Sequence, residues 1–194
     1  MIEIILASQS KVRKKILDAN KIPNKVEPSN IDEDLVKKSL LGENASPEII
    51  SKNLAELKAN KVSLNNNSYL VLGADSVIDL DGELISKPKN REEALEILKK
   101  MNGKKHFLIS SVCISKNGSM IWNYTDKAIL TMKNMTDEYL VDYLSKISDE
   151  KLYSYNVYQI EGEGKKLFSN IEGDENTIMG LPIGKIKEHL KNYQ

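Results

Sequence analysis

Two short apolar runs limit the fold of this chain more than any other feature of its sequence. Residues 2–7 (IEIILA) are apolar with one interruption, and residues 69–74 (YLVLGA) have the same character. Strands that are buried on both faces have near-continuous apolar sequences, because helices cover the sheet from either side. The sequence therefore predicts a sheet with these two strands in its interior.

The rest of the chain predicts a mixture of helices and hairpins. Asp81-Gly82 and Asn117-Gly118 are typical of tight hairpin turns. Hairpins and crossovers together favour an α/β fold with a mixed sheet. No linker-like tract interrupts the sequence, so residues 1–194 are expected to form one domain whose lobes share a core. Helices are expected over 11–20, 46–62, 91–101, 136–147 and 182–192, further strands over 105–115, 120–132 and, as a pair, 153–171, and a polar connection over 23–36.

Charge and cysteine content exclude several classes of protein. The chain has 28 Lys and Arg against 28 Asp and Glu, so no global field attracts nucleic acid or acidic membranes. The single cysteine, Cys113, excludes an internal disulfide and a multi-cysteine metal site. No secretory signal opens the sequence, and no apolar run approaches the roughly 20 residues that span a bilayer. We therefore expect a cytoplasmic protein without membrane partners.

Arg13 is out of place on the first predicted helix. With a step of 100° per residue, Arg13 falls between Ile16 and Leu17 on the inward side. It also lies in the first turn, where the partial positive charge of the helix disfavours a cation. Either its stem snorkels along the surface or its guanidinium meets an anion, and the sequence favours the anion. Ser8 and Ser10, with the N–H groups of the helix start, are candidates to bind phosphate oxygens.

Asp75 directly follows the apolar run at residues 69–74. Ligands of open α/β sheets gather beyond the carboxyl ends of such strands. A carboxylate held there can bind a metal or act as a base, and the alternative is a turn or capping residue.

Three lysines could contribute cations to the same site. Lys58 projects within the inner arc of the helix at 46–62, and Lys61 lies near the edge of that arc, so periodicity does not choose between them. Pairing with a carboxylate is an equally good interpretation of either one. Lys87 ends the strand after the Asp81 hairpin, and Pro88 stiffens the chain that follows.

Other catalytic signatures are missing from the sequence. It has no GxxxxGK[ST] phosphate-binding loop, no GxSxG motif, and only two histidines, far apart. Gly162 and Gly164 do not lead into a predicted helix, so they form no dinucleotide fingerprint. Cations, carboxylates and small hydroxyls remain, which suit a phosphate ester held with a hard divalent metal.

Seven motifs then occur in the order of a known family. They are LASxSxxR at 6–13, IDE at 31–33, LAxxKA at 54–59, GAD at 73–75, DGE with KP at 81–88, GKxH at 103–106, and IEGD with GLP at 171–182. With these motifs the chain resembles the Maf family of nucleoside triphosphate pyrophosphatases, over nearly its whole length.

The resemblance implies an elongated, two-lobed, inosine triphosphatase-like fold with a central cleft, and frequent homodimers. It implies a divalent metal, Mg²⁺ or Mn²⁺, and water attack at the α-phosphorus of a nucleoside triphosphate, which gives a monophosphate and pyrophosphate. Asp75 matches the catalytic base of the family and would share the metal with Glu33. Ser8, Arg13, Lys58 and Lys87 match its other cleft residues. The family pattern thus selects Lys58 over Lys61.

The sequence departs from the family pattern in two places. Ser110-Ser111 stands where many members have Thr-Gly, and residues 155–162 (YNVYQIEG) stand where pyrimidine-type members have AGxYxIQG. Glu161 replaces the glutamine, as in the branch that acts on 7-methyl-GTP. A carboxylate only accepts hydrogen bonds, so it favours a donor edge or a cationic base. The sequence leaves open whether Glu161 contacts the base or the metal, and whether the base is 7-methylguanine or a pyrimidine.

Two other functions stay open at this point. The first is a non-catalytic regulator of cell division or septum formation that binds nucleotides or nucleic acid, although zero net charge and few aromatic residues disfavour a nucleic-acid surface. The second is a phosphohydrolase that releases orthophosphate from a monophosphate ester. The expected partner is a nucleoside triphosphate, with no stable nucleic-acid complex.

Overall fold

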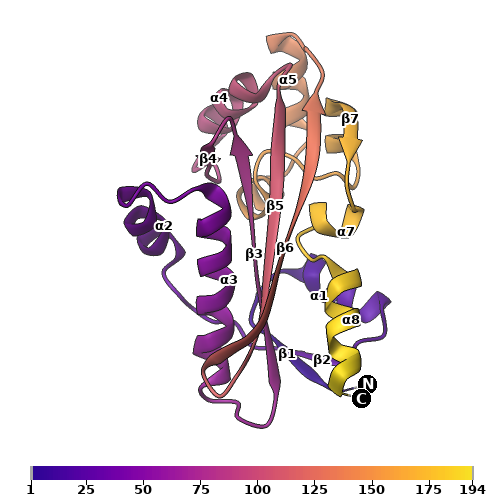
Figure 1. The fold of residues 1–194 in the computed structure, drawn as a ribbon. Coiled ribbons are helices and arrows are strands. Elements are labelled where there is room, and N and C mark those ends of the chain that lie inside the picture. The colour runs from indigo at the N-terminus through magenta and orange to yellow at the C-terminus, as the bar shows by residue number, and fades with distance from the viewer. Residues whose placement is uncertain (1, 194) are drawn as a thin grey trace.

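A seven-stranded mixed sheet runs the length of the molecule in the computed structural model, which describes residues 2–193 (Figure 1). The strands are β1 (Ile4–Leu6), β2 (Asn24–Val26), β3 (Leu70–Leu80), β4 (Glu83–Ile85), β5 (Lys105–Lys116), β6 (Ser119–Met132) and β7 (Phe168–Glu172). Their order is β2-β1-β3-β5-β6-β7, with β4 paired to β3. The β1 strand pairs in parallel with β2 and β3, whereas the other pairs are antiparallel. The predicted mixed sheet is confirmed.

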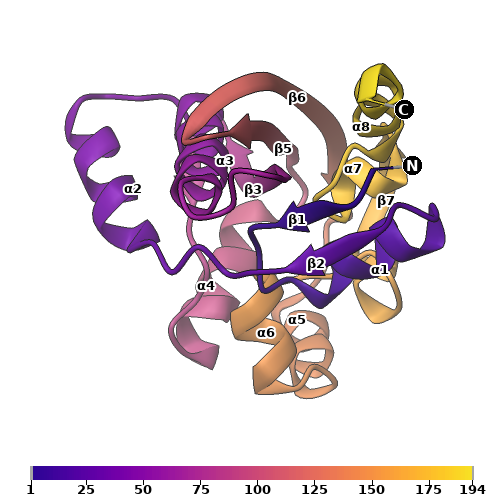
Figure 2. The same cartoon turned by 90° about the horizontal axis from the view of Figure 1, so that it is seen from below.

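Helices cover both faces of this sheet, with α3 on one side and α1 and α8 on the other (Figures 1 and 2). The helices are α1 (Lys11–Ala19), α2 (Glu33–Gly42), α3 (Pro47–Ser63), α4 (Arg91–Met101), α5 (Asp137–Ser145), α6 (Asp149–Tyr155), α7 (Glu175–Ile178) and α8 (Ile183–Leu190), with 3₁₀ turns at Glu163–Leu167 and Lys191–Tyr193. Side chains of Ser10, Ser46, Asn90 and Thr136 accept hydrogen bonds from backbone N–H groups in the first turns of α1, α3, α4 and α5. The five predicted helices are confirmed.

The β3 strand is longer than the sequence indicates. It continues through Asp75 to Leu80 because β5 pairs with it in antiparallel register, from Val71–Ser115 to Asp79–Phe107. The expectation that Asp75 ends its strand is therefore wrong. The parallel pairing with β1 nevertheless stops at Leu72, so Asp75 still lies just beyond the carboxyl end of β1.

The expected polar connection contains a strand and a helix, β2 and α2. The side chain of Asp32 caps α2 by accepting a hydrogen bond from the N–H of Leu35 at 2.9 Å. The acidic residues at its start suit the positive end of a helix. No side chain of α2 is buried, and the helix lies at the edge of the molecule beside α3 (Figure 1).

The strand pair predicted over residues 153–171 is wrong. Helix α6, a loop at 156–162 and a 3₁₀ turn take its place, and only β7 is a strand. Asn156 and Gly162 have φ angles of 75° and 111°, which a strand does not contain. A Cβ on Gly164 would lie 2.0 Å from the carbonyl oxygen of Gln159, so the loop folds closely back on itself.

Two main apolar clusters lie at opposite ends of the sheet. The first joins β1, α1 and α8 and includes Leu6, Leu17 and Leu190, whereas the second joins the far end of β3 to α4, α5 and α6. Met179 packs against both clusters. No helix among residues 2–193 has the length and apolarity to cross a membrane.

Candidate active site

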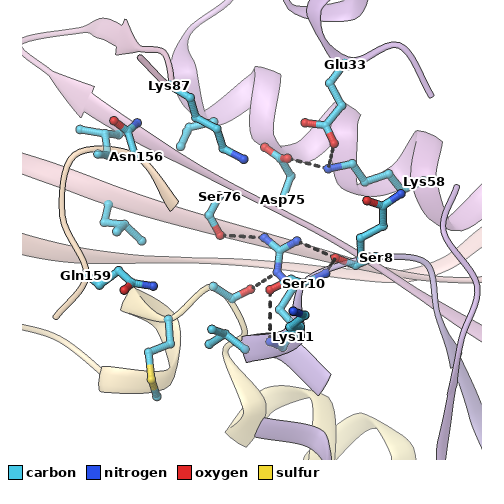
Figure 3. Close-up of a pocket in the computed structure, with 18 of the residues that line it drawn as sticks. Ser8, Ser10, Lys11, Glu33, Lys58, Asp75, Ser76, Lys87, Asn156 and Gln159 are labelled. Atoms are coloured by element: carbon cyan, nitrogen blue, oxygen red, sulfur yellow. Dashed lines mark hydrogen bonds and ion pairs between the residues drawn. The ribbon is translucent and has the colours of Figure 1, made fainter. Parts of the chain in front are cut away.

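A cleft of about 650 Å³ lies beside β3, between the two clusters. The turn before α1, the start of α2, and α3 contribute its charged end, which Figure 3 shows with the side chains as sticks. The loop at 156–162 and the end of β4 with the two residues that follow it, Ser86 and Lys87, contribute its other side. Every site residue that the sequence indicates lines this one cleft: Ser8, Ser10, Arg13, Glu33, Lys58, Asp75, Lys87 and Glu161.

Lys58 lies between two carboxylates at the centre of the charged end. Its Nζ is 2.8 Å from Oδ1 of Asp75 and 2.8 Å from Oε1 of Glu33 (Figure 3). Lys58 and Asp75 are each only 5% exposed. The second oxygen of Asp75, Oδ2, is buried and has no hydrogen-bond partner among the described residues. A buried oxygen of this kind usually has a ligand, a metal or a water as its partner.

Small residues bring α3 close enough to β3 for this contact. A Cβ on Gly73 would lie 2.1 Å from the carbonyl oxygen of Ala55 and 2.7 Å from the backbone nitrogen of Ala59. The helix therefore packs directly against the backbone of the strand at Gly73. Lys58 follows on the same helix, while Lys61 points elsewhere and donates to the carbonyl of Asn30 at 2.8 Å. The choice of Lys58 over Lys61 for the cleft agrees with this geometry.

Arg13 points inward, as its helical position predicts, but protein oxygens already surround it. Its Nε donates to the carbonyl of Gly180 at 3.0 Å, and its Nη1 donates to the carbonyl of Ala74 at 2.9 Å and to Ser8 at 3.2 Å. Its Nη2 donates to Ser76 at 3.1 Å. Four of the five guanidinium N–H groups are thus used, and one Nη2 hydrogen is left for an anion.

Ser76 connects Arg13 to a chain of polar groups that crosses the sheet. Its hydroxyl lies 2.8 Å from that of Ser110, which donates to the carbonyl of Thr177 at 2.7 Å. The Thr177 hydroxyl in turn donates to Asp126 at 2.6 Å. The sequence singled out Ser110 only as a departure from the family pattern. Ser76 could have been found from strand alternation, had β3 been predicted past residue 74.

Ser8 and Ser10 serve the turn before α1. Ser10 accepts a hydrogen bond from the N–H of Arg13 at 3.3 Å, and Ser8 accepts one from the N–H of Ser10 at 3.2 Å. Each hydroxyl still has its own proton to donate. Both can therefore donate to a phosphate oxygen while they cap the helix.

Lys87 leaves β4 and enters the cleft from the opposite side (Figure 3). No hydrogen bond or ion pair of its ammonium is found within the part of the chain that the structure describes. Lys87 is exposed overall, but desolvation by the surrounding cleft lowers its pKa. The positive charges of Lys37 and Arg13 lower this pKa further, while Glu33 and Asp75 oppose them. Lys37 also lines the cleft, and the sequence could indicate it only if α2 had been predicted.

The opposite end of the cleft is largely apolar. Its side chains are those of Ile78, Ile85, Leu108, Tyr158, Ile160 and Ile178. The Tyr158 hydroxyl lies 2.8 Å from Nε2 of His106, and burial lowers the pKa of His106 to about 4. A neutral imidazole therefore holds the tyrosine, and with it the loop at 156–162.

Asn156, Gln159 and Glu161 are the polar side chains of this loop that line the cleft, besides the Tyr158 hydroxyl. Glu161 is exposed at the rim, whereas Gln159 is partly buried and extends into the cleft (Figure 3). An amide can both donate and accept, so Gln159 can contact the edge of a base in two ways. Sequence reasoning missed Gln159 because it falls at a variable position of the family motif.

The two carboxylates fit a hard divalent cation. Burial acts to raise the pKa of Glu33, but Lys58 and Lys37 outweigh it, so the pKa is lowered and the group stays ionised. Mg²⁺ typically takes one or two carboxylates, several waters and substrate phosphates. Within residues 2–193 no set of three or more His, Cys, Asp and Glu side chains could hold a metal without substrate. The unpartnered Oδ2 of Asp75 therefore suits a metal that arrives with phosphates.

Comparisons with known proteins show which family the chain resembles over its length. The sequence model of a family described as "Maf-like protein" matches residues 3–193. A nucleoside triphosphate pyrophosphatase of Pelagibacter ubique is 73% identical over 189 residues, which cover 97% of each chain. A 7-methyl-GTP pyrophosphatase of Rhizobium etli is 34% identical over 190 residues, which cover 96% of each.

Among solved structures, the Ham1 protein of Staphylococcus aureus matches all of both chains with a TM-score of 0.52 and 14% identity. At this identity the likeness concerns the fold alone. Together with the seven-stranded sheet, it confirms the predicted mixed α/β class of inosine triphosphatase-like architecture.

Proposed function

Because this chain belongs to the Maf-like protein family, we propose that it hydrolyses nucleoside triphosphates to nucleoside monophosphate and pyrophosphate. It is then a hydrolase that acts on a phosphoric anhydride. The buried, unpartnered Oδ2 of Asp75 carries the proposal, because a carboxylate oxygen directed into a cleft can accept the proton of an attacking water. The ion pair with Lys58, 2.8 Å from Oδ1, fixes the orientation of this carboxylate.

The other charged residues of the cleft bind and orient the triphosphate. Lys87 offers an unused ammonium, and Arg13 offers its remaining N–H group. Ser8 and Ser10 donate their hydroxyl protons to phosphate oxygens, next to the N–H groups at the start of α1. These contacts hold the α-phosphorus near Asp75 and offset the charge that develops during water attack.

The proposal includes one divalent cation, Mg²⁺ or Mn²⁺, held by Glu33 and Asp75 together with substrate phosphates. Such a cation supplies positive charge at phosphoryl oxygens when it is bound. Glu33 reaches the site from the first turn of α2, so the position of that helix decides whether the second carboxylate is present.

The base of the nucleotide would bind in the apolar end of the cleft, with the polar edge of the base beside Gln159 and Glu161. Glu161 stands where the family pattern has glutamine, and one relative is a 7-methyl-GTP pyrophosphatase. An exposed carboxylate at the rim would attract the positive charge of 7-methylguanine, so we propose 7-methyl-GTP as the first substrate to test, with dTTP and UTP as alternatives.

The test is a panel of nucleotides with Mg²⁺ or Mn²⁺, in which pyrophosphate and orthophosphate are measured separately. Pyrophosphate is the expected product, orthophosphate alone would indicate a different phosphohydrolase, and binding without product would indicate a regulator. Asp75→Asn should lower turnover by about 10²- to 10⁴-fold. Asp79→Asn is the matched control, since Asp79 lies on the same strand but caps the β3–β4 turn through the N–H of Gly82.

The proposal extends to the organisation of the protein. We propose that residues 1–194 act as one domain in which the two apolar clusters are lobes joined by the sheet. The homodimer that the family resemblance implies, and the cytoplasmic location that we expect from the sequence, belong to the same proposal. Light scattering after size-exclusion chromatography tests the dimer, and fractionation of cells tests the location.

A further inference from the structure

Five cationic side chains line the cleft. Lys11 is 81% exposed and lies 3.9 Å from a carboxylate oxygen of Glu150, and the other four fall into two pairs. Lys58 and Arg13 use their donors on protein oxygens: two carboxylates for Lys58, and two carbonyls and two hydroxyls for Arg13. Lys37 and Lys87 do not. Lys87 has no hydrogen-bond or ion-pair partner among residues 2–193, and Lys37 has only a long ion pair with Glu33. The capacity to bind additional negative charge therefore resides mainly in Lys37 and Lys87.

Lys37 reaches the cleft because it shares a helical face with Glu33. The two residues are four apart on α2, and Nζ of Lys37 lies 3.7 Å from Oε2 of Glu33. This distance is well beyond the 2.7–2.9 Å of a charge-assisted hydrogen bond. The Lys37 side chain is nevertheless only 20% exposed, whereas its neighbour Lys38 is exposed. Lys37 is thus held in the cleft without a close partner.

Lys37 and Lys87 come from different parts of the chain and repel one another across the cleft. The charge of Lys37 is among the causes that lower the pKa of Lys87. Lys37 lies on α2, which buries no side chain, and Lys87 lies beyond β4. A ligand with several negative charges would remove the repulsion and join these two segments.

The proposed reaction indicates which part of the substrate this ligand is. The α-phosphorus must lie beside Asp75, and the base requires the apolar end of the cleft. The β- and γ-phosphates then remain for the charged side, where Lys37 and Lys87 have unused donors. Resting on the proposed function, we propose that Lys37 is a substrate-binding residue which, with Lys87, holds the β- and γ-phosphates and the pyrophosphate that leaves.

Binding of the two products separately tests this assignment without turnover. Titration calorimetry with Mg²⁺ compares inorganic pyrophosphate and a nucleoside monophosphate on the wild type, Lys37→Gln and Lys38→Gln. Lys37→Gln should weaken pyrophosphate binding by about tenfold, since it loses a hydrogen bond to a charged group. It should leave monophosphate binding unchanged. Lys38→Gln should bind both ligands as the wild type does, and Lys37→Arg should keep most of the affinity for pyrophosphate.

Two results would overturn the proposal. One is equal pyrophosphate affinity in Lys37→Gln and Lys38→Gln, and the other is an equal loss of monophosphate and pyrophosphate affinity in Lys37→Gln. Circular dichroism of both variants reports whether they fold as the wild type does. If the wild type releases pyrophosphate from a nucleotide but Lys37→Gln binds pyrophosphate as tightly as the wild type does, the role of Lys37 is rejected and the proposed function is not. A wild type that releases no pyrophosphate from any nucleotide rejects the proposed function instead.

Discussion

The two ends of the cleft are built in opposite ways. At the charged end, Arg13, Lys58 and Asp75 project from α1, α3 and β3, and hydrogen bonds to neighbouring elements hold each one. At the apolar end, the loop at 156–162 contributes the polar groups, and the contact between Tyr158 and His106 anchors it. Groups that would perform the reaction are thus fixed by packing, while groups that would select the base lie on a segment that can change without disturbing them.

The largest expected effect is at the charged end. Asp75→Asn keeps the shape of the side chain but removes the base and the charge that pairs with Lys58. We expect kcat to fall by about 10²- to 10⁴-fold for every nucleotide alike. Steady-state rates of pyrophosphate release measure it. A loss confined to some bases would mean that Asp75 belongs to base selection, which contradicts the division between the two ends.

The second-largest effect is expected from a substitution in the packing between α3 and β3, which supports the charged end. Gly73→Ala places a Cβ 2.1 Å from the carbonyl oxygen of Ala55, so α3 must move away from β3. We expect the free energy of unfolding to fall by about 3 kcal/mol and Lys58 to separate from Asp75. Urea denaturation measures the stability. Gly184→Ala is the control, because a Cβ there meets no atom within 4 Å, and unchanged stability in Gly73→Ala would refute the close packing.

The apolar end should respond to acid. His106 has a pKa of about 4 in the folded protein, below the ordinary value of 6.5, so the unfolded chain binds the proton first as the pH falls. Stability should therefore decrease between about pH 6.5 and pH 4, by about 2 to 3 kcal/mol. Urea denaturation at pH 7.5 and 4.5 measures the loss. His106→Gln should lose less stability over this interval than the wild type, and an equal loss would exclude His106 as its source.

The charged end should respond to alkali instead. Because the pKa of Lys87 is lowered, its charge is lost at a lower pH than that of an ordinary lysine. We expect KM for the nucleotide to rise by up to about tenfold as Lys87 loses its proton, with kcat less affected. Lys87→Arg, which stays charged, should move this rise to higher pH. An unshifted profile in Lys87→Arg would assign the titration to another group.

The smallest effect should come from the loop. Gln159→Leu removes both hydrogen-bonding groups from the side chain that extends into the cleft. We expect the ratio of kcat/KM between two bases to change by about fivefold, while pyrophosphate affinity stays the same. Competition between paired nucleotides measures the ratio. A matching change in pyrophosphate affinity would show that the loop also contributes to the charged end.

Sequence patterns predicted the charged end better than the loop. Helical periodicity placed Arg13 inward and Lys58 within the inner arc, because the buried residues of both helices recur at helical spacing. Periodicity could not identify the hydrogen-bond partners of Arg13. One of them is the carbonyl of Gly180, which is distant in sequence. The extension of β3 past Asp75 also depends on a non-local partner, β5.

The helix and the loop that the sequence did not predict have explanations in their own residues. Helix α2 buries no side chain, so its four apolar residues do not mark a core-facing stripe, although Asp32 is a recognisable cap. The segment 153–171 has strand-like composition, but tertiary contacts fold it into a helix and a loop, with Asn156 and Gly162 at positive φ. Side chains on such a loop, including Gln159, take their positions from contacts that a single sequence does not contain.

The shared core of β1 and α8 also has a consequence for synthesis. Ile4 and Leu6 pack in the same cluster as Ile186 and Leu190, so a segment that is translated early is completed by one that is translated much later. Arg13 likewise receives its Gly180 acceptor only after 167 further residues have been added. A ribosome-bound chain that has not yet released Gly180 and α8 therefore lacks part of the support of its cleft.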